Sequence, residues 1–149
     1  MKNTHIFLVF IINVINISCN SQNINQKKFI SNFINSIVLK DSVKVDELSY
    51  FLQLDDNSIK DNFKVIKFNI EFLKTELKAK NYIILTYNEF KSRKEFNDYE
   101  IIYSDVNKIY CIVYNHKFIT LIIIDNNKII SFFTGIVKNK KRIFPYYFK

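Results

Sequence analysis

The side chains that most often perform covalent chemistry are scarce in this chain. It contains two cysteines and two histidines among 149 residues. Cys111 and His116 are close in sequence, but His116 falls in a predicted hairpin turn, and the odd spacing points the two side chains to different faces. We therefore interpret Cys111 as a buried small hydrophobe and His116 as an exposed turn residue.

Metal and cofactor sites would need residues that the sequence does not supply. Zinc sites combine several His, Cys or carboxylate ligands at matched spacing, and no such cluster is present. The runs 55–57 and 125–127 are rich in Asp and Asn but lack the glycine and the terminal glutamate of a calcium loop. Gly135 is the only glycine, whereas phosphate-binding loops need several. We expect no metal and no cofactor.

Carboxylates remain candidate acid–base groups, because folding can bring distant ones together. Five of them gather around the loops that flank one predicted strand, among lysines and an arginine. That setting favours a solvated, salt-bridged rim over a catalytic pair. These residues are Glu89, Glu95, Asp98, Glu100 and Asp105.

Cys19 is set apart by its position between an apolar run and a polar run, in the stretch INISCNSQN at residues 15–23. Lys2 is the only charged residue before Lys27, and residues 6–17 are apolar apart from two asparagines. A short basic start, an apolar stretch and a small residue at a cut site are typical of a secretory signal peptide. The run is too short for a membrane-spanning helix, which needs roughly 20 apolar residues.

The cut site resembles the lipobox of bacterial lipoproteins, in which a small residue precedes an invariant cysteine. Ser18 and Cys19 match that pattern and Ile17 fits the position before them, whereas Asn16 stands where the family prefers an aliphatic residue. The resemblance implies that the sulfur of Cys19 is acylated and that a dedicated peptidase leaves this cysteine as the new N-terminus. It also implies a membrane-anchored protein of the bacterial cell envelope.

The resemblance divides the chain into a signal peptide at residues 1–18, a flexible tether at 19–27 and a single α+β domain at 28–149. An ordinary secretory cut after Ser21 is the alternative, and it would release a soluble protein. In both cases Cys111 has no partner for an intramolecular disulfide.

A basic cluster near the C-terminus is a second candidate contact site. The chain carries 22 basic and 14 acidic side chains and a formal charge of +8, which favours anionic neighbours. An exported protein rarely meets nucleic acid, and no nucleic-acid motif is present, so anionic lipid headgroups are the expected contact. The simpler interpretation is a solvated turn beside an edge strand. The cluster consists of Lys138, Lys140, Lys141 and Arg142.

Apolar spacings of three and four residues predict helices in the first half of the chain, at about residues 26–39, 43–54 and 58–79. The last is the clearest, because the polar residues 55–58 supply an N-terminal cap and an apolar stripe runs along its length. We expect this long helix to lie across a sheet.

After Lys80 the pattern changes to short runs of β-branched and aromatic residues separated by turn signals. These runs predict a meander of about five antiparallel strands. One of them, FITLIII, is apolar almost throughout, which is typical of a central strand with both faces covered. The runs are NYIILTYNEF, DYEIIYS, KIYCIVY, KFITLIIID and KIISFFTG.

Helices followed by strands indicate an α+β fold, with N-terminal helices packed on a curved antiparallel sheet. The element order is similar to that of NTF2-like and cystatin-like folds. Such a fold would present a partly aromatic, exposed sheet face, or the mouth of a cavity between the sheet and the long helix. The tyrosines expected on that face are Tyr82, Tyr87, Tyr99, Tyr103, Tyr110 and Tyr114.

These observations favour a small lipid-anchored envelope protein that binds and does not catalyse. It would contact the membrane through the anchor, and either a protein partner or an apolar ligand through the cavity. Two alternatives stay open. One is a small enzyme that uses carboxylates and tyrosines in such a cavity, and the other is a protective partner of a toxin or hydrolase that acts at the envelope.

Overall fold

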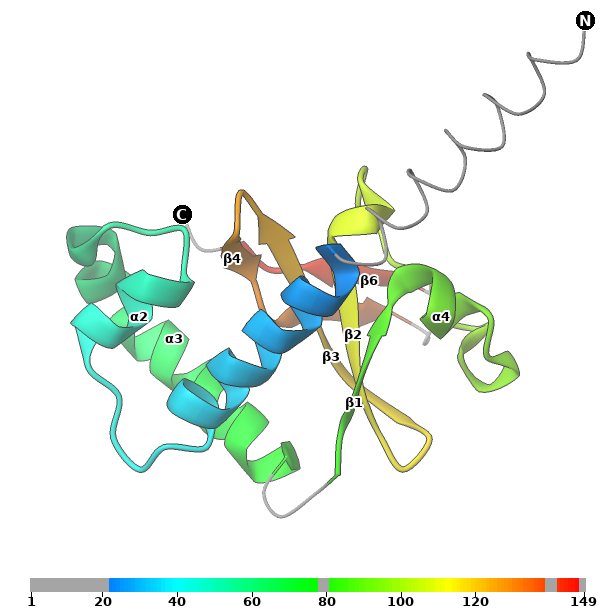
Figure 1. The fold of residues 1–149 in the computed structure, drawn as a ribbon, viewed down its shortest axis with the longest axis horizontal. Helices are drawn as coiled ribbons and strands as arrows, with labels where there is room; N and C mark the ends of the chain where they lie inside the picture. The colour runs from blue at the N-terminus through cyan, green and yellow to red at the C-terminus, as the bar shows by residue number, and fades with distance from the viewer. Residues whose placement is uncertain (1–21, 78–80, 139–141, 148–149) are drawn as a thin grey trace, which may run out of the picture.

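The protein folds into layers around a four-stranded antiparallel sheet (Figure 1). The computed structural model describes residues 22–77, 81–138 and 142–147. Helices from the first half of the chain cover one face of the sheet. A short helix, irregular segments and a two-stranded sheet cover the other face. The α+β class predicted from the sequence is confirmed.

The first helix covers residues 22–33 and continues as the π-helical turn η1 (Ile34–Val38). Its apolar residues at helical spacing, Ile30 and Ile37 among them, are buried against the sheet and the other helices. The helix predicted at 26–39 is therefore confirmed, although it extends further toward the N-terminus.

The structure shortens the expected tether at 19–27, because residues 22–27 are helical. Asn23 also accepts a hydrogen bond from the hydroxyl of Tyr110 in the sheet. Helical hydrogen bonds and this tertiary contact order a polar stretch whose composition alone is that of a linker. Residues 19–21 lie outside the described residues.

Two further helices, α2 (Val45–Phe51) and α3 (Asp56–Leu77), pack on the same face of the sheet. α2 is shorter than the helix predicted at 43–54, because Leu52 is extended and forms a bridge to Ile129 of the sheet. α3 runs for 22 residues, as its apolar stripe predicts.

The start of α3 differs from the predicted range of 58–79. The carboxylate of Asp55 accepts a hydrogen bond from the backbone N–H of Ser58 at 2.8 Å. Asp55 is therefore the N-terminal cap, and Ser58 lies within the first turn. Residues 78–80, at the predicted end of this helix, lie outside the described part of the chain.

The central sheet is an open antiparallel meander. Its third strand is buried on both faces, as the apolar run FITLIII predicts. In the order in which they lie side by side, the strands are β1 (Ile83–Thr86), β2 (Ile109–Tyr114), β3 (Lys117–Asp125) and β4 (Lys128–Ser131).

Asparagines make the two tight turns of this meander. Asn115 and His116 join β2 to β3, Asn126 and Asn127 join β3 to β4, and all four residues have positive φ. Two-residue hairpin turns of type I′ require that conformation at both central positions, and asparagine adopts it more readily than most residues. The turn predicted at His116 is confirmed.

The predicted five-strand meander is wrong in its first half. β1 stops at Thr86, because the Thr86 hydroxyl accepts a hydrogen bond from the N–H of Glu89 and begins the helix α4 (Tyr87–Lys91). The segment at 98–104 forms only an isolated bridge at Ile101, so β1 pairs directly with β2. The connection between them contains the short turns η2 (Lys94–Phe96) and η3 (Val106–Lys108).

The last predicted strand, at 128–135, is split between two sheets. β4 ends at Ser131, and β5 (Thr134–Lys138) pairs instead with β6 (Arg142–Pro145) in a separate sheet. The Ser131 hydroxyl donates a hydrogen bond to the carbonyl of Tyr146 at 2.6 Å. This bond ties the C-terminal segment to the point where the chain changes sheet.

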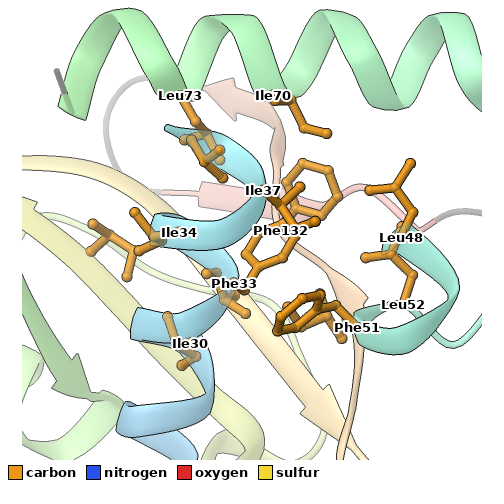
Figure 2. Packing of buried hydrophobic residues seen from close by; sticks show 14 of the residues in the cluster. Ile30, Phe33, Ile34, Ile37, Leu48, Phe51, Leu52, Ile70, Leu73 and Phe132 are labelled. Atoms are coloured by element: carbon orange, nitrogen blue, oxygen red, sulfur yellow. The ribbon is translucent and has the colours of Figure 1, made fainter. Parts of the chain in front are cut away.

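The central sheet separates two hydrophobic cores, because successive residues of a strand point to opposite faces. In β2, Ile112 faces the helices and Cys111 faces the other layer. On the helical face the ring of Phe33 lies 5.5 Å from that of Phe51 and 5.3 Å from that of Phe132 (Figure 2). These contacts join the first helix, α2 and the residue that follows β4.

The expected exposed aromatic face of the sheet is wrong, because both faces are covered by the described layers. Fully buried side chains, Ile112 and Ile122 among them, occupy the space between sheet and helices, where the sequence predicts a cavity. The tyrosines are divided between the layers: Tyr82, Tyr110 and Tyr114 pack on the helical side, and Tyr87, Tyr99 and Tyr103 pack on the other.

Candidate functional site

The site residues predicted from the sequence fall partly beyond the described ranges. Cys19, Lys140 and Lys141 lie outside the described residues. Lys138 and Arg142 are backbone partners in the β5–β6 pair. The first and last residues of the basic cluster are therefore side by side at one end of the small sheet.

Cys111 and His116 do not form a reactive pair. Cys111 is a free cysteine with no exposed surface, and burial raises the pKa of its thiol. His116 is exposed, and its Nδ1 lies 3.1 Å from Oε1 of Glu95. The predicted roles of a core hydrophobe and an exposed turn residue are confirmed.

The predicted acidic rim is salt-bridged at Glu89, Glu95 and Asp105. Asp98 and Glu100 are exposed, and they form no ion pair with the residues that the structure describes. Within these same residues no group of three or more His, Cys, Asp or Glu side chains is placed to hold a metal ion.

A polar groove beside the start of the first helix is the candidate site that the structure adds. It consists of two adjoining hollows with volumes of about 380 and about 240 Å³. Gln22, Asn107, Lys108 and Tyr110 line both. The larger hollow extends to the turn between β3 and β4, and the smaller one to the start of α4.

Amide side chains dominate the lining of the groove. An amide offers both hydrogen-bond donors and an acceptor, so such a surface can match a ligand that has both. Gln26 and Asn127 already bond to each other, Nε2 to Oδ1 at 3.0 Å, which fixes the distance between the first helix and the β3–β4 turn. The amides of the larger hollow are Gln22, Gln26, Asn107, Asn126 and Asn127.

Tyr110 places a phenol where the two hollows meet. Tyr110 is buried, and its hydroxyl donates a hydrogen bond to Oδ1 of Asn23 at 3.0 Å. Burial raises the pKa of Tyr110, and the negative charge of Glu89 raises it further. The side chain therefore stays a neutral phenol near neutral pH, and it acts as a hydrogen-bonding group.

The charged groups of the groove are paired with one another. Nζ of Lys108 lies 2.8 Å from Asp125 and 3.7 Å from Asp105. The hydrogen bond to Asp125, together with the charges of both carboxylates, raises the pKa of Lys108. Lys108 thus remains a cation held between two carboxylates, and the groove offers it to an anionic ligand only at the cost of breaking these pairs.

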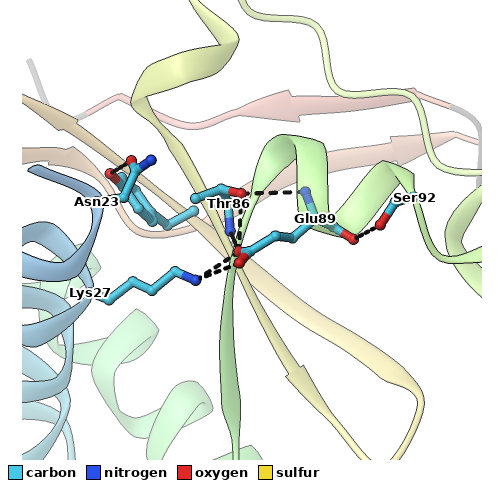
Figure 3. Close-up of polar contacts among 6 residues, drawn as sticks. Asn23, Lys27, Thr86, Glu89 and Ser92 are labelled. Carbon is cyan, nitrogen blue, oxygen red and sulfur yellow. Dashed lines mark hydrogen bonds and ion pairs between the residues drawn. The ribbon is translucent and has the colours of Figure 1, made fainter. Parts of the chain in front are cut away.

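A second ion pair fixes the walls of the smaller hollow. Nζ of Lys27 lies 2.7 Å from Oε2 of Glu89, and the same oxygen accepts a hydrogen bond from the N–H of Thr86 at 2.6 Å (Figure 3). Burial raises the pKa of Glu89, but the Lys27 ammonium and the Thr86 donors outweigh it and lower the pKa. The first helix is thereby fastened to the start of α4.

Sequence reasoning missed this groove because its residues come from four separate segments. Each segment has a sufficient local explanation in the sequence, as a tether, a strand or a turn. The available signal was the density of amides before residue 27 and in the turn at 126–127. The segments are 22–26, 86–88, 105–110 and 124–127.

Comparisons of the chain with protein-family models, with curated proteins and with solved structures find no match. In the part of the chain that the structure describes, no helix combines the length and the apolar character needed to cross a membrane.

Proposed function

We propose that this protein is a lipid-anchored protein of the bacterial cell envelope that binds a ligand without catalysis. The lipobox-like Ser18 and Cys19 support the anchor. The folded part begins by residue 22, and the few residues from Cys19 to that point span at most about 10 Å. An anchor at Cys19 would therefore hold the groove close to the membrane surface.

The amide-rich lining of the groove is the observation that carries the binding role. Gln26, Asn107 and the Tyr110 hydroxyl present donors and acceptors, whereas the ionic groups are paired within the protein. This lining suits an uncharged, polyhydroxylated ligand such as an envelope glycan, because each sugar hydroxyl also donates and accepts. An apolar ligand between sheet and helices is less suitable, because packed side chains occupy that space.

Binding also accounts for the composition of the groove. No cysteine, serine or histidine of the described residues lines either hollow. The raised pKa of Tyr110 makes it a poor base near neutral pH.

A second candidate function, glycan hydrolysis, follows from the placement of two carboxylates. Asp125 lines the larger hollow and Asp105 the smaller one, with Lys108 between them. Glycoside hydrolysis commonly uses such a pair. If the groove hydrolyses its ligand, Asp105→Asn or Asp125→Asn will abolish release of sugar products while binding persists.

The anchor is tested by expressing the whole chain in a bacterial host and measuring the intact mass of the protein in membrane and soluble fractions. We expect a membrane-bound chain that begins at an acylated Cys19. Cys19→Ser should abolish the added acyl mass and leave residues 1–18 uncut, and the control Cys111→Ala should do neither. A soluble chain that begins at Gln22, or one that retains Met1, would contradict the anchor.

The groove is tested by titrating the mature protein with uncharged oligosaccharides from bacterial envelopes and following amide chemical shifts. We expect shifts along the four segments of the groove. Asn107→Ala should weaken binding about tenfold, the effect of one lost hydrogen bond. Asn97→Ala, an exposed asparagine in the layer behind the sheet, is the matched control. Equal weakening by both variants would count against the groove.

The basic cluster at 138–142 is proposed to contact anionic headgroups. Each basic residue near such a surface contributes about 1 kcal/mol, so serine at all four positions should weaken binding to phosphatidylglycerol vesicles about a thousandfold. The measurement uses the mature chain, residues 19–149 with Cys19→Ser, which lacks both the acyl chain and the apolar signal residues. A control variant replaces four exposed lysines elsewhere: Lys28, Lys44, Lys60 and Lys67. Equal losses of vesicle affinity in both variants would show that net charge, and not the cluster at 138–142, determines binding.

A further inference from the structure

The outer face of α3 carries an apolar stripe. Val65, Phe68 and Phe72 are exposed by 41%, 69% and 42%. Their spacings of three and four residues align them along one side of the helix, which is the pattern of a helix–helix seam. The ring of Phe72 also lies edge-on to that of Phe133 at 6.2 Å, which extends the stripe toward the segment between the two sheets.

Two opposite charges flank this stripe. Lys64 and Glu71 are both exposed, and their spacing of seven residues places them on the same side of the seam. Neither forms an ion pair with residues 22–77, 81–138 or 142–147. A basic residue near one end of the stripe and an acidic residue near the other make the face complementary to itself in one orientation.

That orientation is antiparallel. A two-fold axis through the middle of the stripe brings Lys64 of each copy beside Glu71 of the other and forms two ion pairs. The same axis brings the Phe68 rings of the two copies together and places Val65 near Phe72. In a parallel pairing the two-fold axis runs along the helices, so the Lys64–Glu71 flanks of the two copies lie on opposite sides of the seam and form no ion pairs with each other.

We infer that α3 is a self-association surface, on which a second copy of this chain docks in antiparallel orientation. An anionic membrane is a poorer occupant, because the acidic and basic residues of α3 are equal in number. The acidic residues are Asp56, Asp61, Glu71 and Glu76, and the basic residues are Lys60, Lys64, Lys67 and Lys74.

Sedimentation of the mature chain, residues 19–149 with Cys19→Ser, over a range of concentrations tests this inference, since neither an acyl chain nor the apolar signal residues then drive association. We expect a monomer–dimer equilibrium. Phe68→Ala should weaken the dimer about a hundredfold, because it truncates the aromatic residue at the centre of the interface. Lys64→Glu and Glu71→Lys should each weaken it about tenfold by setting like charges together.

The double variant, Lys64→Glu with Glu71→Lys, exchanges the two charges and should restore association to the level of the parent chain. Lys67→Glu makes the same charge change on α3 away from the seam and should have no effect. A chain that stays monomeric at every concentration would overturn the inference, as would a dimer indifferent to Phe68→Ala. A double variant no better than the single ones would overturn the antiparallel arrangement.

Discussion

Three helical segments, the first helix, α2 and α3, cover one face of the central sheet. Short turns, the five-residue helix α4 and the β5–β6 pair cover the opposite face. The helical layer satisfies its backbone hydrogen bonds within each element and presents apolar residues at regular spacing. This regularity is local, so it can be recognised in the sequence as apolar residues three and four positions apart.

The opposite layer, between residues 87 and 108, is held by hydrogen bonds outside any regular helix or strand. Nζ of Lys91 donates hydrogen bonds to the carbonyls of Asn97 and Tyr99. Ile143 of β6 donates its N–H to the carbonyl of Glu100 at 2.7 Å. These bonds join residues at irregular separations along the chain, so no repeating sequence pattern predicts them.

Aromatic rings fill this second layer. Phe90 and Phe96 are stacked with centroids 4.5 Å apart and planes at 7°, and Tyr99 and Phe118 surround them. Both phenylalanines are as buried as Phe33 on the helical side. The comparison therefore predicts that the irregular layer is as firmly packed as the regular one, in spite of its few backbone hydrogen bonds.

The largest test of that comparison truncates one buried ring on each side. Phe33→Ala and Phe90→Ala should each lower the free energy of unfolding by about 3–5 kcal/mol, the usual cost of removing a buried phenylalanine ring. Urea denaturation followed by circular dichroism measures both. If Phe90→Ala costs much less, or adds a separate early transition, the irregular layer unfolds on its own and the comparison fails.

A smaller test addresses the polarity of the second core at Cys111. Cys111→Ser should lower the free energy of unfolding by about 1–3 kcal/mol, because the hydroxyl finds an apolar site without a partner. Cys111→Ala separates this effect from the loss of volume and should be the milder change. An equal loss of unfolding free energy in the two variants would show that the polarity of the serine hydroxyl does not cause the destabilisation.

The pKa of Cys111 adds a pH dependence. Burial raises the pKa in the folded state, so the folded protein keeps a neutral thiol where the unfolded chain ionises. The stabilising contribution is complete below the unfolded pKa of about 8.5 and declines as pH rises above it. Unfolding measured from about pH 7 to about pH 10 should show a loss of stability that Cys111→Ala reduces.

The cap of α3 sharpens the account of the helical layer. Asp55→Ala should cost about 1 kcal/mol, because the N–H of Ser58 loses its acceptor at the end of the longest helix. Ser58→Ala should cost less, because its side chain lies inside the first turn. Thermal unfolding of the two variants measures both losses of stability. A larger loss for Ser58→Ala than for Asp55→Ala would show that Ser58 is the cap.

The smallest expected effect concerns the ion pair that joins the two layers, Lys27 with Glu89. The pKa of Glu89 is lowered in the folded state, so its contribution is present above the unfolded pKa of about 4.3 and is lost as pH falls through the folded value. Between about pH 5 and about pH 3, Glu89→Gln should therefore lose less stability than the parent chain. Glu95→Gln is the control. An identical loss of stability with acid in all three proteins would contradict a contribution from the Lys27–Glu89 ion pair.

Elements and turns whose signals are local were predictable from the sequence. The helix at 26–39 and the long helix near 58–79 follow from apolar residues three and four apart, and asparagines mark both tight turns. The burial of Cys111 also follows from its apolar neighbours.

Tertiary structure decided the remainder. The run that begins at Asn81 also suits a longer strand. The Thr86–Glu89 capping box is a local signal for α4, and the ion pair of Glu89 with Lys27 of the first helix is the tertiary contact that adds to it. The residues at 98–104 have strand-like composition, but in the described part of the chain they form a bridge only at Ile101. The groove exists only where the first helix, η3 and two turns meet, and such a meeting depends on contacts that no local pattern encodes.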